Sequence, residues 1–408
     1  MKLDQVRALD ADDPLGPLRE RFDLPPELVY LDGNSLGALP RSVPGRLEAA
    51  VREAWGRELI TSWNTHGWID LPRQVGEKIA PLLGAAPEQV VACDSISVNL
   101  FKLLSCAVSL RPGRTRLLSQ TDNFPTDLYV AEGFAGLTDV ELTTVDADAI
   151  EDAIDETVAA VFLTHVNFRS GRVHDMARIT RRAHAAGALV IWDLAHSAGA
   201  MPLDLDGCNV DFAVGCGYKY LNGGPGAPAF VYVAARHQES ARQPLSGWMG
   251  HAEPFAFEPR YTPGAGLQRF LSGTPPVLSM LALDEALNVF ANVDLHAVHA
   301  KALALGQLLE TLIEADPALS NLRAAHPADV AARGSQLAFR HPQAYQLCQA
   351  LIERGIITDF RAPDLLRIGF TPLYTRYEDV WRLASDLADI LRTGAHLAPR
   401  FAERARVT

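Results

Sequence analysis

An acid and a lysine in the middle of the chain have the types and spacing that cofactor chemistry requires. Asp193 follows the apolar run Ala188–Trp192, and Lys219 follows the largely apolar run Asp211–Val214 a short crossover later. If both runs are strands of a parallel sheet, both side chains lie at the edge where open α/β sheets bind ligands. Pyridoxal phosphate needs such a pair, a lysine for an imine and a carboxylate for its pyridinium nitrogen. The pair therefore predicts a pyridoxal-phosphate site.

Both residues also have a simpler interpretation. Lysines are usually exposed, and an acid that follows a strand often caps the next helix. Lys219, however, stands between two tyrosines and before a glycine-rich turn, a setting in which partial desolvation favours an imine-forming lysine. His196 follows Asp193 one helical turn later. The coincidence of these residues at two strand ends favours a functional site.

The composition is that of an ordinary globular protein. The 408 residues are too many for one simple core, and 48% of them are hydrophobic and 21% charged. A net charge of −12 disfavours nucleic acid as a partner, because phosphate binding needs a basic face. The N-terminus has no apolar signal region, and no apolar stretch is long enough for a membrane span. The five cysteines form no close metal-ligand pair and their odd number suits a reducing compartment, so we expect a cytoplasmic protein without a metal site.

The first two thirds of the chain alternate between strand and helix patterns. Strands are expected at 90–93, 116–119, 159–166, 188–192, 211–214 and 228–233. Helices are expected at 42–59, 71–83, from Asp94 or Ser95 onward, 128–134, 148–156 and 176–186. This alternation predicts an α/β fold, a mostly parallel central sheet with helices on both faces. Strands that are apolar throughout fit burial on both sides.

The remainder of the chain predicts a smaller α+β domain. Its helices are expected at 279–290, 294–315, 343–354 and 378–392, and its strands at 335–339, 356–360 and 365–369. The long Gly/Pro-rich segment 244–278 is expected to be functional or to lie at an interface. We divide the chain into an N-terminal segment that packs with the small domain (1–45), a large cofactor-binding domain (46–280) and a small C-terminal domain (281–408).

Other strand ends carry further candidates, each with a structural alternative. Ser95 and Ser97 begin a helix and suit an anion, although a helix cap alone would explain them. Phe124 suits stacking on a planar cofactor but also suits a core position, and Asp127 is either a site residue or a helix cap. Asn34 lies in the turn YLDGNSLG, which either lines a ligand cleft or is only a loop.

Arg367 is the candidate for binding a substrate carboxylate. It lies in a predicted strand of the second domain, within LLRIGFTPLYTR. A guanidinium matches a carboxylate through two parallel charge-assisted hydrogen bonds, and an amino-acid substrate offers that carboxylate. The alternative, a surface ion pair, fits the residue type equally well.

Eight short motifs, taken in chain order, resemble the kynureninase family of the fold-type I (aspartate aminotransferase-like) pyridoxal-phosphate enzymes. They span nearly the whole chain and are YLDGNSLG, ISVNL, NFPTD, WDLAH, YKYLN, GWMGH, SGTPP and LRIGFTPLY. The resemblance implies hydrolysis of L-kynurenine to anthranilate and L-alanine in tryptophan catabolism. It also implies a homodimer whose active sites lie at the subunit interface.

The resemblance assigns roles to individual residues. Lys219 is implied as the imine lysine, Asp193 as the partner of the pyridinium nitrogen, and Tyr218 as a phosphate contact and general acid/base. The other implied cofactor contacts are Ile96, Ser97, Phe124, Asp127, Thr164 and His196, with Trp248 and Thr274 from the neighbouring subunit. Ser97 stands where the family often has threonine and keeps the hydroxyl. The implied substrate contacts are Arg367, Asn34, Gly273 and Thr274.

Individual residues bear on the substrate and on the alternatives to this activity. Relatives that act on 3-hydroxykynurenine tend to carry Ser-Asn at the position of Gly273-Thr274, which points to kynurenine as the preferred substrate. A class V aminotransferase or a cysteine desulfurase would share the fold, but Cys348, the C-terminal cysteine, lies in a helical pattern and not in a reactive loop. A non-catalytic cofactor-binding relative is disfavoured, because the acid, the lysine and the arginine are all present.

Overall fold

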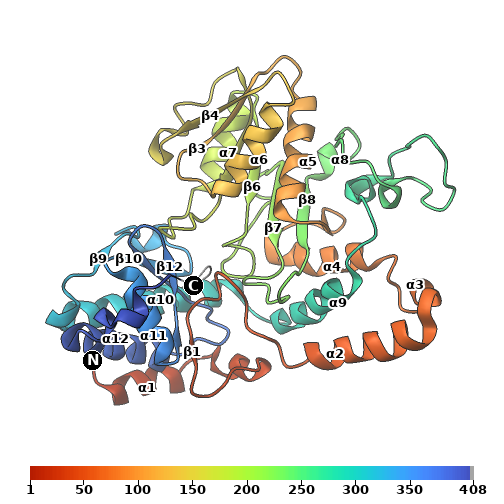
Figure 1. Ribbon diagram of the computed structural model, residues 1–408. Coiled ribbons are helices and arrows are strands. Elements are labelled where there is room, and N and C mark those ends of the chain that lie inside the picture. The colour runs from red at the N-terminus through yellow and green to blue at the C-terminus, as the bar shows by residue number, and fades with distance from the viewer. Residues whose placement is uncertain (405–408) are drawn as a thin grey trace.

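The computed structural model describes residues 1–404, and its larger part is built on a seven-stranded sheet (Figure 1). The strand order is β2-β8-β7-β6-β5-β3-β4. Only β8 runs antiparallel to its neighbours, so the predicted mostly parallel sheet is confirmed. The strands are β2 (Val90–Ala92), β3 (Arg116–Gln120), β4 (Glu141–Val145), β5 (Val158–Thr164), β6 (Leu189–Asp193), β7 (Phe212–Cys216) and β8 (Ala229–Val233).

Helices cover both faces of this sheet, as the apolar strands predict. In β6, Leu189 and Ile191 pack into one core cluster, whereas Val190 and Trp192 pack into another. Successive strand residues point to opposite faces, so a wholly apolar strand is buried only between two layers. One layer contains α5 (Ile96–Ser109) and α6 (Pro125–Ala135); the other contains α4 (Leu71–Ile79), α7 (Met176–Ala185) and α9 (Val277–Ala286).

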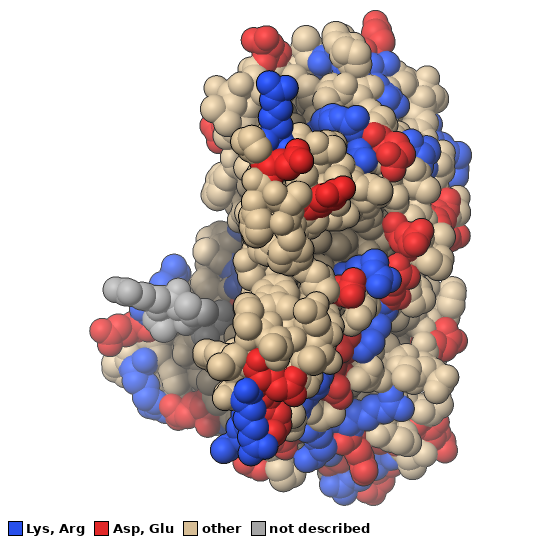
Figure 2. Space-filling view, turned by 90° about the vertical axis from the view of Figure 1, so that its right-hand side faces the viewer, with Lys and Arg blue, Asp and Glu red and all other residues tan. Residues whose placement is uncertain are grey.

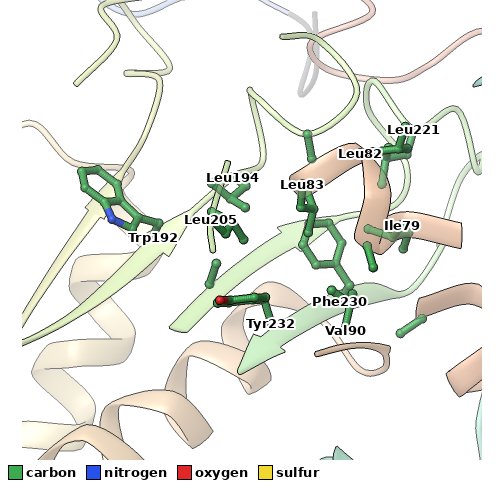
Figure 3. Close-up of a cluster of buried hydrophobic side chains, with 14 of the residues drawn as sticks. Ile79, Leu82, Leu83, Val90, Trp192, Leu194, Leu205, Leu221, Phe230 and Tyr232 are labelled. Carbon is green, nitrogen blue, oxygen red and sulfur yellow. The ribbon is translucent and has the colours of Figure 1, made fainter. Parts of the chain in front are cut away.

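The core cluster that contains Val190 and Trp192 anchors the segment that leaves the sheet at Asp193. Phe230 and Tyr232 of β8 lie beside Ile79 and Leu83, and Trp192 lies at the other end of the cluster (Figure 3). All five side chains are almost completely buried. Burial of a large apolar side chain contributes about 1.5–3 kcal/mol, so this packing fixes the end of β6 firmly.

The smaller part contains an antiparallel sheet in the order β12-β13-β10-β9 with helices against it. The N-terminal segment joins it: α1 packs against α12, and Val6 and Val29 belong to its core. The elements are α1 (Leu3–Ala11), β1 (Val29–Tyr30), α10 (Leu295–Ala315), β9 (Arg323–Ala324), β10 (Gln336–Arg340), α11 (Ala344–Glu353), β11 (Ile356–Ile357), β12 (Asp359–Arg361), β13 (Leu365–Gly369) and α12 (Tyr377–Thr393). The boundaries of the three predicted segments remain a prediction, and the last four residues of the third lie outside the described residues.

Three predicted elements differ from the structure. The helix expected at 148–156 is wrong: a single 3-10 turn, Ala147–Ala149, is followed by turns. Asp155 accepts hydrogen bonds from the amide and the hydroxyl of Thr157, and such local bonds compete with a helix. Strand β4 was not predicted, because its exposed edge position needs no continuous apolar run.

The strand expected at 356–360 is two strands in two sheets. β11 pairs in parallel with β1, and β12 pairs with β13. The chain therefore changes partners at Thr358, which pattern alone does not reveal.

The helix expected at 42–59 is present but changes type along its length. It begins as α2 (Val43–Ala49) and continues as a π-helical segment to Glu58. The short helices α3 (Ser62–Thr65) and α8 (Ala235–Gln238) are the remaining α-helices.

Among residues 1–404, no helix is long and apolar enough to cross a membrane, and no group of His, Cys, Asp and Glu side chains could hold a metal ion. On the face drawn in Figure 2, basic and acidic side chains are intermixed.

Candidate active site

A cavity of about 580 Å³ opens at the carboxyl ends of the central strands. Its walls come from the ends of β5, β6 and β7, the first turns of α5 and α6, and the turn that carries the lysine. Nine of the residues predicted to bind the cofactor line it: Ile96, Ser97, Phe124, Asp127, Thr164, Asp193, His196, Tyr218 and Lys219. Parallel strands place their carboxyl ends on one edge, so these distant residues meet there.

Strand register places two of these residues side by side. Thr164 ends β5 and is the ladder partner of Asp193, the last residue of β6. Asp193 was expected just after the strand; it ends the strand instead. The buried Thr164 hydroxyl has no hydrogen-bond partner, and neither has Asp127 Oδ1. Buried polar atoms are rarely left unpaired, so these two mark positions where a polar ligand is required.

The start of α5 forms the anion-binding end of the cavity. Ser95 is the N-cap and accepts from the Val98 amide at 3.4 Å, so the predicted cap is confirmed. The next two residues, Ile96 and Ser97, present first-turn amides at the positive end of the helix dipole, which suits a phosphate. Asp94 precedes them in a left-handed conformation with φ of 49°. Its carboxylate pairs at 2.6 Å with Lys102, a lysine that is completely buried and holds this turn in place.

Two buried carboxyl groups, Asp127 and Asp193, share the centre of the cavity. Burial raises the pKa of Asp127 well above its ordinary range, and the charge of Asp193 raises it further. Burial also raises the pKa of Asp193, but the charge of Lys219 and the Ala195 amide, which donates to Asp193 at 2.7 Å, oppose that rise. Asp127 therefore carries the proton and Asp193 the charge. An ionised Asp193 can hold a proton on a heteroaromatic nitrogen.

The histidine beside Lys219 is neutral. Burial, followed by the charge of Lys219, lowers the pKa of His196 well below its ordinary value. Lys219 Nζ lies 3.1 Å from His196 Nε2, and His196 Nδ1 lies 3.2 Å from Gln336 Oε1. Burial raises the pKa of Tyr218, so its phenol keeps its proton. The amine thus contacts a neutral imidazole and lies 5.7 Å from the centre of the Tyr218 ring.

Aromatic rings form one side of the cavity. Phe124 meets Phe168 edge to face at a centroid distance of 5.2 Å, and Lys219 Nζ lies 5.8 Å from the Phe124 centroid. A flat heteroaromatic ring can stack on Phe124 while a carboxylate meets its nitrogen and a helix start meets its phosphate. Together with the two unpaired polar atoms, these residues fit pyridoxal phosphate.

Arg367 comes from β13 and lies behind the cavity wall: it contacts Phe168, which lines the cavity, but does not line the cavity itself. It is 1% exposed, so the surface alternative for this residue is wrong. Its Nη1 donates to Phe168 O at 2.6 Å, its Nη2 donates to Ser35 Oγ at 3.0 Å, and it forms an ion pair with the buried Asp359. Asn34, adjacent to Ser35, is also buried. The turn around Asn34 therefore meets the arginine, but neither Asn34 nor Arg367 lines the cavity.

Three further predicted residues lie away from the cavity and from the residues that line it within one chain. Trp248 is 37% exposed, packs edge to face on Phe255, and does not line the cavity. Gly273 and Thr274 are exposed and lie outside the cavity as well. The segment that carries them lies on the side of the large domain away from the small domain (Figure 1).

Sequence reasoning missed two neighbours of the site, Phe168 and Gln336. Phe168 lines the cavity, and Gln336 contacts His196. A weak signal existed for Gln336, because a glutamine inside a predicted buried strand needs a polar partner. Phe168 follows the predicted strand 159–166 in a loop, where nothing in its local sequence separates a cavity wall from a core position.

Comparisons with known proteins agree with this geometry. Residues 298–387 match the family described as kynureninase C-terminal domain, and residues 130–210 match the DegT/DnrJ/EryC1/StrS aminotransferase family. A kynureninase of Burkholderia mallei is 51% identical over 99% of each chain. A kynureninase of Deinococcus radiodurans is 52% identical over 96% of this chain and 97% of its own.

Solved structures of other proteins share the fold of this chain. A cysteine desulfurase of Escherichia coli has a TM-score of 0.78 at 22% identity, with 93% of this chain and 98% of that chain covered. A cysteine desulfurase of Thermococcus onnurineus has a TM-score of 0.77 at 17% identity, with 92% and 98% covered. At this identity the likeness concerns the fold alone.

Proposed function

The chain belongs to the kynureninase family of pyridoxal-phosphate-dependent carbon–carbon hydrolases, and we propose that it cleaves L-kynurenine to anthranilate and L-alanine at the cavity described above. One observation supports the location best. Lys219, the neutral His196 and the Asp127–Asp193 pair meet in one cavity, and Arg367 contacts Phe168 in its wall.

Each residue of this chain then has a task. When bound, pyridoxal phosphate supplies an electron-accepting ring. Asp193 keeps the ring nitrogen protonated, because neutral Asp127 leaves the charge on Asp193. Lys219 Nζ takes the proton from the substrate Cα and is the proton donor for the later return. Arg367 holds the α-carboxylate and so fixes the orientation of Cα towards Lys219.

Water must attack the side-chain ketone before the Cβ–Cγ bond breaks. The protonated phenol of Tyr218 suits a general acid for the steps at Cβ, because its raised pKa keeps the proton available. Anthranilate leaves first, and the three-carbon remainder takes a proton and leaves as L-alanine.

A cysteine desulfurase needs a reactive cysteine, and neither Cys348 nor Cys216 is suited to that role. Cys348 lies in α11, is completely buried, and donates to Thr358 O at 3.4 Å. Burial raises the pKa of its thiol to about 12, so the reactive thiolate does not form near neutral pH. Cys216 lines the cavity, but it is buried in β7 and its pKa is raised as well.

The assay for this proposal is the release of anthranilate. Purified holoenzyme mixed with L-kynurenine is expected to produce anthranilate fluorescence and one equivalent of L-alanine. In parallel reactions, kynurenine is expected to give a higher kcat/KM than 3-hydroxykynurenine, because Gly273-Thr274 lacks the side chains of hydroxykynurenine-specific relatives. Absence of anthranilate at saturating cofactor would refute the activity, and a preference for the hydroxylated substrate would refute only the specificity.

We further propose that the enzyme is a cytoplasmic homodimer in which Trp248 and Thr274 complete the site of the other subunit. Trp248 is one of several exposed apolar side chains on segments at the large domain's outer side; others are Trp55, Leu59, Ile60, Phe255 and Phe257. Exposed large apolar side chains in such number are characteristic of a covered surface.

A hybrid-dimer experiment tests this sharing. Lys219→Ala and Trp248→Ala homodimers are each expected to be inactive or nearly so. Mixing them under conditions of subunit exchange should restore roughly a quarter of wild-type activity, because half the dimers are hybrids and one of their two sites is intact. If Trp248 served its own subunit, both sites of every hybrid would be defective and no activity would return.

A further inference from the structure

A buried glutamine connects the lysine end of the site to the arginine end. Gln336 lies in β10 of the smaller part and is 1% exposed. Its Nε2 donates to Phe168 O at 2.9 Å, and its Oε1 lies 3.2 Å from His196 Nδ1. Among residues 1–404, Gln336 is the only side chain that hydrogen-bonds both to His196 and to the Phe168 carbonyl that Arg367 also contacts.

The carbonyl of Phe168 fixes which way the Gln336 amide points. A carbonyl only accepts, so Nε2 must face Phe168 and Oε1 must face His196. Arg367 Nη1 donates to the same carbonyl at 2.6 Å. The backbone of Phe168 is therefore a shared anchor for the arginine and for the glutamine.

The orientation of Gln336 in turn fixes the tautomer of His196. Because Gln336 Oε1 only accepts, the proton of the neutral imidazole is on Nδ1. His196 Nε2 then carries the lone pair and faces Lys219 Nζ at 3.1 Å as an acceptor. The opposite tautomer would present an N–H to the lysine and leave two acceptors facing each other at Nδ1.

Asn34 extends the connection to the arginine. Its Nδ2 donates to Gln336 Oε1 at 3.0 Å. Turning this amide over would instead let its oxygen accept from Arg367 Nε at 3.1 Å, but would set that oxygen against Gln336 Oε1. In the orientation that bonds to the glutamine, the arginine is reached through the adjacent Ser35, whose Oγ accepts from Arg367 Nη2 at 3.0 Å. The turn that carries Asn34 and Ser35 thus contacts both the glutamine and the arginine.

We propose that Gln336 is a positioning residue of this site. It sets the His196 tautomer that faces Lys219, and it couples that histidine to the position of Arg367 through the Phe168 carbonyl and the turn at Asn34 and Ser35. The inference rests on the proposed function for its meaning, since it concerns the same lysine and the same substrate arginine. Its geometry involves only residues of this chain.

Two substitutions distinguish the bond that Gln336 makes to His196 from the bond that it makes to Phe168. Gln336→Met removes both the acceptor and the donor at similar volume. Gln336→Glu keeps an acceptor towards His196 and adds a negative charge, but it sets an oxygen against the Phe168 carbonyl. Gln120→Met is the matched control, because Gln120 is also buried and contacts a buried histidine, His174, but lies outside the cavity.

The measurement is the pH midpoint of the visible absorption of the bound cofactor in the holoenzyme. His196 Nε2, held as an acceptor by Gln336, stabilises the protonated form of the Lys219 nitrogen. Gln336→Met releases that histidine and should therefore lower the midpoint by about 0.5–1 pH unit. Gln336→Glu should raise the midpoint, because it adds a negative charge on the His196 side of Lys219. Both variants should raise KM for kynurenine several-fold, because both disturb the Phe168 anchor of Arg367. Gln120→Met should leave the midpoint and KM unchanged.

Opposite shifts in the two variants support the proposal, because a merely structural glutamine would lower stability without moving the midpoint in two directions. Unchanged midpoints, or shifts of the same sign, overturn it. The absorption measurement requires only bound cofactor. If the wild-type enzyme released no anthranilate, the proposed function would fail while the role of Gln336 in setting the midpoint would still be decided.

Discussion

Replacing Lys219 with alanine abolishes turnover and removes the imine-dependent visible absorption of the bound cofactor. The expected loss in kcat/KM is about 10³-fold or more, because the same amine forms the covalent link and moves the proton at Cα. The neighbouring residues argue for this role. Lys219 Nζ faces a neutral imidazole at 3.1 Å and lies within 5.8 Å of the ring centres of Phe124 and Tyr218.

The Lys219 experiment has a matched control in Lys78. Lys78 is a partly exposed lysine of α4 that pairs with Asp284 at 2.7 Å, outside the cavity. Lys78→Ala should retain the turnover and the absorption of the wild type. The cofactor should still bind Lys219→Ala without a covalent link, since the first turn of α5 and the Asp127–Asp193 pair are untouched; dialysis and absorption report both states. Retained turnover in Lys219→Ala would exclude this lysine as the imine former.

Replacing Arg367 with lysine raises KM for kynurenine by about 10- to 100-fold, with a smaller change in kcat. A planar guanidinium offers a carboxylate two parallel hydrogen bonds, and a lysine offers one point charge. Lysine is preferred to alanine as the first substitution because Asp359 is completely buried beside Arg367. Removing the positive charge would leave that buried carboxylate with only its ion pair to Arg361 at 2.8 Å, and a buried charge that loses a partner destabilises the fold.

A second variant separates binding from stability at this position. In Arg367→Met with Asp359→Asn, the arginine and the buried negative charge disappear together, so the fold should be less affected than in Arg367→Met alone. Substrate affinity should fall to the same extent in both. An analogue of kynurenine that lacks the α-carboxylate should bind equally to wild type and to the variants. If the carboxylate-bearing substrate kept its wild-type affinity in the double variant, Arg367 would have no part in binding it.

The two arginine-dependent results also bear on Gln336. Arg367 and Gln336 donate to the same carbonyl, so the effects of Arg367→Lys and Gln336→Met on KM should not be additive. Independent roles would give additive changes in the free energy of substrate binding.

The architecture of the large domain and the position of its cavity could be predicted from the pattern of the sequence. Strands apolar throughout, such as the one that ends at Asp193, must be buried on both faces, and the alternation with helices makes them parallel. Residues that follow such strands then meet at one edge. For this reason nine predicted residues line one cavity, although they come from segments more than a hundred positions apart in the chain.

The contacts between the site residues could not be predicted from the sequence and are seen only in the tertiary structure. Pattern reasoning sees one element at a time, and it therefore wrongly predicted a helix where Asp155 bonds with Thr157, and one strand where β11 and β12 belong to different sheets. The same limit hid Gln336 and Phe168. Their importance lies in contacts with His196 and Arg367, which are set by how the two domains pack and by which polar group is left to satisfy each buried atom.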